Sequence, residues 1–94
     1  MITCLMFGNY SGPSLADISP DRTKEAVAQI SELGGEVKSM YALLGGNDLV
    51  FIANFPDIPQ ALKASVLLSR TLGIQFTTHP AITIEEFDTL IAEE

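Results

Sequence analysis

A tight turn between two apolar runs, Gly45-Gly46-Asn47-Asp48, is the feature that most constrains the fold of this chain. Glycine and asparagine tolerate the positive φ angles that close a β-hairpin, so we expect positive φ at Gly45 or Gly46 and paired strands over 37–44 and 48–55. The second strand is apolar on both faces, which is typical of a strand covered on both sides. The hairpin is therefore expected at the centre of the fold, with something covering its second face.

A strand and a helix are predicted before the hairpin. Residues 1–7 form a short, mostly apolar run typical of a buried strand, and residues 8–13 have the composition of a loop, followed by a helical turn over 14–18. Ser19-Pro20 predicts an N-cap with proline at the first helical position. Gly34-Gly35 predicts the helix end at a left-handed residue. The buried stripe of this helix is expected to comprise Ala26, Val27, Ile30 and Leu33.

A second helix, a fourth strand and a terminal helix are predicted after the hairpin. Asp57 is the expected N-cap of a helix that ends at Gly73, and residues 74–82 predict a strand. Thr83 and Glu86 have the spacing of a capping box and predict a short helix over 84–92. The apolar side of the second helix is expected to contain Leu62, Val66, Leu67 and Leu68, with Ala61 and Ala64 allowing close packing. In the terminal helix, Phe87, Leu90 and Ile91 are expected to point inward.

The element order β-α-β-β-α-β is that of the ferredoxin-like split βαβ unit. We therefore expect an α+β fold in which both helices cover one face of a four-stranded antiparallel sheet, with a short C-terminal helix added. The 94 residues are expected to form one domain over 1–94. Because two helices cover only one face of two-sided strands, a second copy is the simplest cover for the other face. The expected assembly is a dimeric α+β barrel.

The charge balance points away from several partners. The chain has 12 acidic and 5 basic residues and a net charge of −7, and the basic residues are scattered. Nucleic acids and anionic membranes require clustered Lys and Arg, so neither is expected as a partner. A single cysteine forms no internal disulfide, and no signal peptide or membrane-length apolar run is visible. A cytoplasmic, homo-oligomeric protein is expected.

His79 is the strongest candidate for a functional side chain. Histidine is the only side-chain type that ordinarily changes protonation near neutral pH. The strand period of two places it with Gln75, Thr77 and Ala81, on the face opposite Ile74, Phe76, Thr78 and Ile82, which is expected to face the helices. His79 is therefore expected on the oligomer face, either as a ligand contact or general base or as a hydrogen-bonded interface residue.

Three further side chains are candidate functional residues, and a purely structural role is an open alternative for them. Asp48 opens a strand after the tight turn, and is either a general base or an acceptor for turn N–H groups. Tyr41 is expected to share a strand face with Val37, Ser39 and Leu43, as a ligand contact or as a packed tyrosine. Tyr10 lies in the first predicted loop, where it is a candidate for lining a cleft.

Cofactor and metal motifs are absent from the sequence. Cys4 lies in a predicted central strand without an electropositive setting, so buried packing is the expected role of its thiol. One histidine and one cysteine far apart do not match the spacings of zinc sites. Gly45-Gly46 leads into a strand rather than a helix and lacks a phosphate-binding lysine, so we expect no cofactor.

Several of these motifs together resemble the GYD domain family, small bacterial and archaeal proteins of the dimeric α+β barrel type. The resemblance covers most of the chain through Ser19-Pro20-x-Arg22, Leu33-Gly34-Gly35, the hairpin, and Glu85-Glu86-Phe87. The name-giving motif falls at 45–49, where Gly45 and Asp48 match and Asn47 replaces the tyrosine. The resemblance implies a fold more than an activity.

Two hypotheses about function remain open. The first is a non-catalytic oligomeric module that binds a small molecule or serves assembly. The second is a cofactor-independent enzyme, such as a small monooxygenase, isomerase or decarboxylase, with His79, Asp48 and Tyr41 in one pocket. The convergence of His79 and Asp48 in one concave pocket is the observation that separates them.

Overall fold

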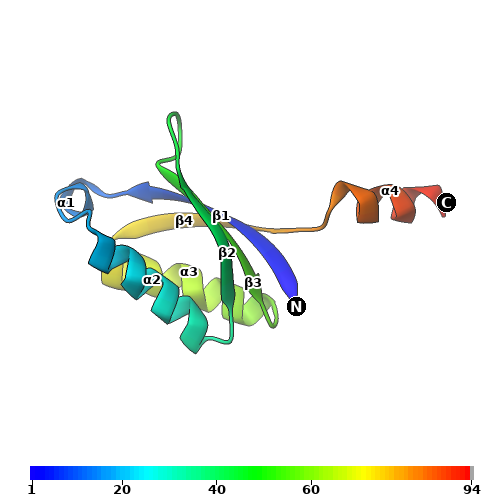
Figure 1. The fold of residues 1–94 in the computed structure, drawn as a ribbon, viewed down its shortest axis with the longest axis horizontal. Helices are drawn as coiled ribbons and strands as arrows, with labels where there is room; N and C mark the ends of the chain where they lie inside the picture. The colour runs from blue at the N-terminus through cyan, green and yellow to red at the C-terminus, as the bar shows by residue number, and fades with distance from the viewer. Residues whose placement is uncertain (94) are drawn as a thin grey trace.

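The computed structural model describes residues 1–93 as an antiparallel four-stranded sheet in the order β2-β3-β1-β4, with α2 and α3 on one face (Figure 1). The predicted α+β, ferredoxin-like arrangement is confirmed. The elements are β1 (Ile2–Tyr10), α1 (Gly12–Leu15), α2 (Pro20–Glu32), β2 (Glu36–Ala42), β3 (Leu49–Phe55), α3 (Ile58–Leu72), β4 (Ile74–Ala81) and α4 (Ile84–Ala92).

The predicted helix boundaries are set by local hydrogen bonds. The side chains of Ser19, Asp57 and Thr83 accept the backbone N–H groups of Arg22, Gln60 and Glu86 at 3.3, 2.9 and 3.1 Å. These bonds satisfy N–H groups that a helix start leaves without intrahelical partners. At the other end, Gly34 follows α2 with φ 79° and Gly73 caps α3 with φ 68°. Local sequence signals were therefore sufficient to place both ends of the long helices.

The core lies between the sheet and the two long helices. Its sheet side alternates with the strand period, and its helix side is rich in small residues that allow close approach. Its largest fully buried side chains are Met6, Ile30, Phe55 and Leu68. The remaining core residues are Cys4, Ala26, Leu49, Phe51, Ala53, Ala61, Ala64, Leu72 and Ile74.

Strand β1 is longer than predicted. It continues through Gly8, Asn9 and Tyr10, which the composition had indicated as loop, and pairs these residues with Phe76, Gln75 and Ile74 of β4. The glycine is required by packing rather than by a turn, because a Cβ atom at Gly8 would lie 2.7 Å from Leu49 Cδ1 and 2.8 Å from Phe76 Cε1. Close approach, not chain reversal, explains this glycine.

Helix α3 buries Leu68 and the close-packing Ala61 and Ala64, as predicted, but not Leu62 and Val66. Ala61, Ala64, Leu68 and Leu72 pack on the sheet, whereas Leu62 and Val66 point outward. The helix carries two apolar stripes, and the stripe containing the alanines allows its backbone to approach the sheet closely. The prediction for Leu62 and Val66 is therefore wrong, and Ile58, Leu62 and Val66 form an exposed row on α3 that we call the α3 stripe.

Helix α4 is also placed differently from the prediction. It forms over Ile84–Ala92, but none of its residues is buried, and it projects beyond the end of the sheet (Figure 1). Strand β4 ends at Ala81, so Ile82 belongs to the connection and is exposed rather than directed toward the helices. Phe87, Leu90 and Ile91 therefore do not point inward within one subunit.

The hairpin turn has the backbone that its glycines predicted. Gly45 adopts φ 141°, whereas Gly46 is not among the positive-φ residues, and a Cβ at either position would meet nothing within 4 Å. We expect Gly45→Val to lower the free energy of unfolding by at least ~1 kcal/mol, because the cost is backbone strain alone. Gly46→Val is the matched control with a smaller expected loss. Urea unfolding of both variants measures the difference, and equal losses would contradict the assignment of strain to Gly45.

Candidate functional site

The sheet face turned away from α2 and α3, called the outer face below, contains most of the candidate residues. Strand pairing aligns its side chains in rows, since β1, β3 and β4 are in continuous register. One row runs Tyr41, Val50, Phe7, Thr77, and the next runs Ser39, Ile52, Leu5, His79. The centre of the outer face is therefore apolar and its two edges are polar.

Tyr41 reaches the outer face because of an irregularity in β2. The pairing with β3 shifts between Val37, which is opposite the inner residue Ala53, and Ser39, which is opposite the outer residue Ile52. This bulge places Val37 toward the helices, where it packs on the core. The prediction that Tyr41 shares a face with Ser39 is confirmed, and the prediction that it shares one with Val37 is wrong. Tyr41 itself is exposed.

His79 is exposed on the outer face, as the strand period predicted. Its ring meets the Phe7 ring edge-on, with centroids 5.9 Å apart and an interplanar angle of 71°. The opposite face of β4 turns toward α3, where the hydroxyl groups of Thr78 and Ser65 are hydrogen-bonded at 2.5 Å. Gln75 and Thr77 are exposed on the same strand as His79. The polar stripe of β4 therefore exists, and its histidine is held against an aromatic ring.

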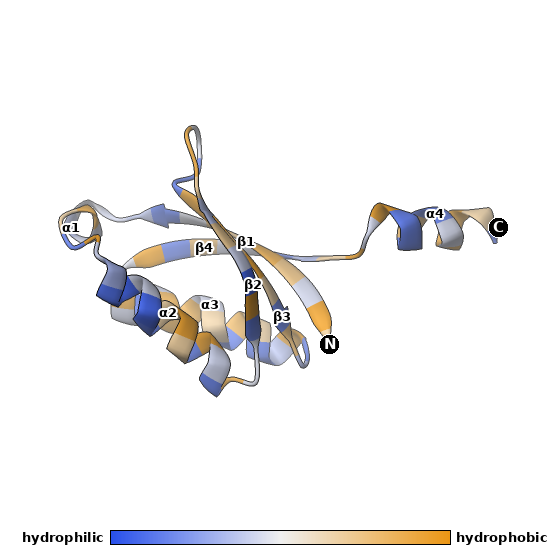
Figure 2. Ribbon diagram, viewed as in Figure 1, coloured by the Kyte–Doolittle hydropathy of each residue, from blue (hydrophilic) through white to orange (hydrophobic). Residues whose placement is uncertain are grey.

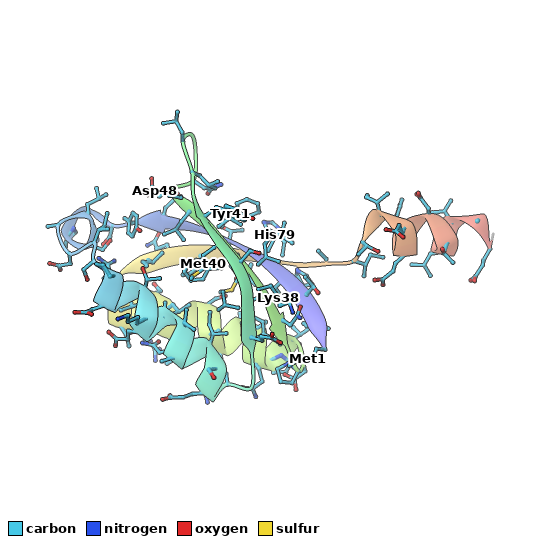
Figure 3. The ribbon with its side chains drawn as sticks, in the orientation of Figure 1. Met1, Lys38, Met40, Tyr41, Asp48 and His79 are labelled. Atoms are coloured by element: carbon cyan, nitrogen blue, oxygen red, sulfur yellow. The ribbon has the colours of Figure 1, made fainter. Side chains whose placement is uncertain are left out.

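Tyr41 and His79 lie on the same face but at opposite edges of the sheet. Figure 3 shows both on the side away from α2 and α3. Strand β2 and strand β4 are the two edges, so three strand spacings, roughly 14 Å, separate them. Phe7 and Val50 lie between the two side chains. Within one subunit, the Tyr41 phenol and the His79 imidazole are therefore not in direct contact.

Asp48 is engaged by the backbone at the end of the sheet. Its carboxylate Oδ2 accepts the N–H of Tyr10 at 2.8 Å, and its carbonyl accepts the N–H of Leu43 at 2.8 Å. Its own N–H donates to Gly8 O at 2.9 Å and to Asn9 Oδ1 at 3.2 Å. These bonds close the hairpin onto β1. Asp48 therefore acts as an acceptor for backbone N–H groups and does not meet His79, which removes the juxtaposition that the enzyme hypothesis required.

Tyr10 is held by a residue that sequence reasoning left without a role. The Arg22 guanidinium lies 5.4 Å from the centre of the Tyr10 ring and donates to the carbonyl oxygens of Ser14 and Leu72, the latter at 2.6 Å. This arginine joins α1, α2 and the end of α3. Its position at the start of α2, after Ser19-Pro20, was the available signal. Tyr10 lines a small cavity of about 50 Å³ beside Arg22, too small for a metabolite.

Cys4 and the acidic residues show no arrangement of a reactive or metal-binding site within residues 1–93. Burial raises the pKa of the Cys4 thiol, because desolvation disfavours the thiolate. Among the described residues, no group of three His, Cys, Asp or Glu side chains is placed to hold a metal ion. Over the same part of the chain, none of the helices combines the length and apolarity that crossing a membrane requires.

Larger depressions lie at the margins of the sheet. One, of about 590 Å³, runs between α3 and β4 and is lined by Leu62, Val66 and Arg70 on one side and by Gln75, Phe76 and Thr77 on the other. A second, of about 550 Å³, lies where Met1 and Leu5 meet the segment from Pro80 to Thr83. Gln75 and Thr77 thus border a groove, in contrast to Asp48.

Solved structures with the same fold include two proteins that are named as regulators. The leucine response regulatory protein LrpA of Mycobacterium tuberculosis superposes with a TM-score of 0.61 at 16% identity, over 87% of this chain and 51% of the regulator. An AsnC family transcriptional regulator from Agrobacterium tumefaciens gives 0.58 at 18% identity, over 87% and 50%. This chain thus spans about half the length of these regulators, and the likeness concerns the fold.

A structure of similar length also shares the fold. The protein TTHA0845 from Thermus thermophilus superposes with a TM-score of 0.51 at 19% identity, over 88% of this chain and 95% of that protein. None of the curated proteins compared with the chain matches it significantly. A family model described as the GYD domain matches residues 4–91.

Proposed function

Because the chain belongs to the GYD domain family, with residues 4–91 matched, we propose that residues 1–94 act as one self-associating module that binds a small molecule at the outer face of its sheet. The observation that carries the proposal is the make-up of this face. Its centre consists of Leu5, Phe7, Val50 and Ile52, and its edges carry Tyr41 and His79.

Self-association follows from the apolar centre of the outer face. Leu5, Phe7 and Ile52 are only partly buried in one subunit, although each lies on a central strand. A contiguous apolar patch bordered by polar groups is the usual mark of an interaction surface. Two outer faces meeting each other would bury these side chains and leave the polar edges at the rim, which is the arrangement of a dimeric α+β barrel.

Ligand binding is proposed at the polar edges of that interface. A two-fold axis parallel to the strands brings β2 of one copy over β4 of the other. Because such an axis keeps each row at its own height along the strands, Tyr41 of one copy then faces Thr77 of the partner subunit, with His79 of the partner subunit in the adjacent row. Within one copy, roughly 14 Å separates the same two strands. A phenol and an imidazole beside an apolar wall suit a small molecule with both a polar and an apolar part.

The structural neighbours support a sensing role over a catalytic one. One of them is named a leucine response regulatory protein. Asp48 is committed to backbone hydrogen bonds, and among residues 1–93 His79 forms no ion pair with an acidic side chain. We therefore propose that the bound molecule is a small amino acid or carboxylic acid, recognised through its charged group by His79 and Tyr41.

The His79 ring is the direct probe of this proposal. Because it is the only histidine, its ring signals are assigned without further variants. We expect a member of a panel of the twenty amino acids and simple carboxylic acids to shift these signals, because a carboxylate bound beside the ring changes the ring's electrostatic environment. The measurement is an NMR titration of the ring with each compound.

Two variants serve as controls for the titration. Tyr41→Phe is expected to perturb the His79 ring signals only when the two residues lie in adjacent rows across the dimer, since they are far apart in one copy. His79→Gln is expected to keep the circular dichroism spectrum while abolishing ligand-induced shifts elsewhere on the outer face. If no compound shifts the ring and His79→Gln only lowers stability, His79 is a structural residue and the ligand proposal fails.

A further inference from the structure

Helix α4 is the part of the described chain whose packing is least explained. Its apolar residues Ile84, Phe87, Leu90 and Ile91 are between 50% and 73% exposed. The helix continues from β4 through the two residues Ile82 and Thr83 and extends away from the sheet and from α2 and α3 (Figure 2). An isolated helix of this length is marginal in water, so α4 requires a surface to pack against.

The side chains of α4 are divided into two faces. At 3.6 residues per turn, its four large apolar residues fall within an arc of about 120°. The rest of its surface carries Glu85, Glu86, Asp88 and Glu93, and the helix has no basic residue. The surface that receives α4 should therefore be apolar along its middle and basic along its border.

The α3 stripe has these properties. Ile58, Leu62 and Val66 follow one another at four-residue spacing and are 42–64% exposed. Leu62 and Val66 also form one wall of the 590 Å³ groove between α3 and β4, in which Phe76 adds further apolar surface. An apolar row beside a groove is the usual receptor for an amphipathic helix.

The charges on α3 complement those on α4. Lys63 and Arg70 are exposed beside the α3 stripe, and α3 contains no acidic residue. Within residues 1–93 the ion pair formed is Lys38–Glu36, so neither Lys63 nor Arg70 is paired. Exposed ion pairs contribute little stability, so the apolar contact carries the affinity and the charges set the orientation.

We propose that α4 of one copy docks on the α3 stripe of a second copy, with its acidic side toward Lys63 and Arg70. A second copy is the proposed partner because, within one subunit, α4 extends away from α3 and none of its residues is buried (Figure 2). The contact uses the helix layer, whereas the dimer proposed above uses the outer face. The two contacts are therefore independent and their failures are distinguishable.

Paramagnetic NMR tests the docking directly in the wild-type background. A spin label is attached at Ala92→Cys of an unlabelled copy, where Cys4 is buried and does not compete for the reagent. This copy is mixed with wild-type protein labelled with ¹⁵N. We expect selective loss of the amide signals of residues 58–70, and no such loss when the spin-labelled copy also carries Phe87→Asp. Loss confined to the outer face, or no loss, overturns the proposal.

A complementation experiment provides a second, independent test. Phe87→Asp disables the arm formed by α4 and leaves the α3 stripe intact, whereas Leu62→Asp disables the stripe and leaves the arm intact. Each variant alone is expected to lose the α4-dependent association in sedimentation velocity, and an equal mixture is expected to regain it, because the arm of one fits the stripe of the other. Both side chains are exposed, so neither variant is expected to disturb folding. A mixture that behaves as its separate components contradicts docking between copies.

Discussion

Ile52→Asp is expected to abolish the outer-face dimer, which leaves 10.1 kDa monomers or only the association made through α4. Ile52 lies on the central strand β3, between Leu5 and Ser39 on the outer face. An aspartate there would be buried without a partner in the proposed dimer, a change that typically costs about 3–5 kcal/mol. The association constant should therefore fall by at least about a hundredfold. Sedimentation velocity across a micromolar concentration range measures this change.

Leu44→Asp is the matched control for this substitution. Leu44 lies in the hairpin turn and is fully exposed, so the same change from a branched aliphatic side chain to a carboxylate should leave association unaltered. A wild-type protein that sediments as a monomer at all concentrations would contradict the outer-face dimer. An Ile52→Asp variant that associates as the wild type does would contradict it equally.

Phe55→Ala is expected to have the largest effect on folding. Phe55 ends β3 with no exposed surface and is the largest fully buried side chain of the core. Its truncation removes apolar contact and leaves a cavity, which typically costs about 3–5 kcal/mol. Since domains are stable by only about 5–15 kcal/mol, the variant should be close to unfolding at about 25 °C. Urea unfolding followed by circular dichroism, at fixed protein concentration, gives the difference.

Two comparisons make the Phe55 result interpretable. Leu44→Ala removes apolar surface that is already in water and should change the free energy of unfolding by less than about 0.5 kcal/mol. Fixed concentration is needed because self-association stabilises the folded state by mass action. A loss below about 1 kcal/mol for Phe55→Ala would show that the sheet and helices do not form the core described here.

Local signals in the sequence were sufficient to predict the helices and strands and their order along the chain. Ser19, Asp57 and Thr83 begin their helices by accepting N–H groups within three residues, and Gly73 ends α3 through its own φ angle. Gly45 likewise closes the hairpin through its positive φ angle. These features depend on a few neighbouring residues, so they can be read from the sequence and from the ferredoxin-like order that they compose.

The candidate site was predictable only residue by residue. The period of two placed His79 on the outer face correctly, because β4 is regular. The same period placed Val37 on the wrong face relative to Tyr41, because β2 contains a bulge that the local sequence did not predict. Whether Asp48 and His79 meet depends on strand order and register, which separate Asp48 at the end of the sheet from His79 within β4.

The sequence by itself determined which segments are helices and strands, where the long helices begin and end, and that β1 and β3 carry apolar residues on both faces. Only the tertiary structure decided that Leu62 and Val66 of α3 stay exposed, that β1 continues to Tyr10, and that no residue of α4 is buried in its own subunit. The reason is physical: capping, turn geometry and periodicity arise from adjacent residues, whereas burial is a competition among surfaces distant in the chain. On α3, Ala61 and Ala64 lie buried against the sheet while Leu62 and Val66 stay exposed, an outcome set by packing between distant segments rather than by the residues next to them.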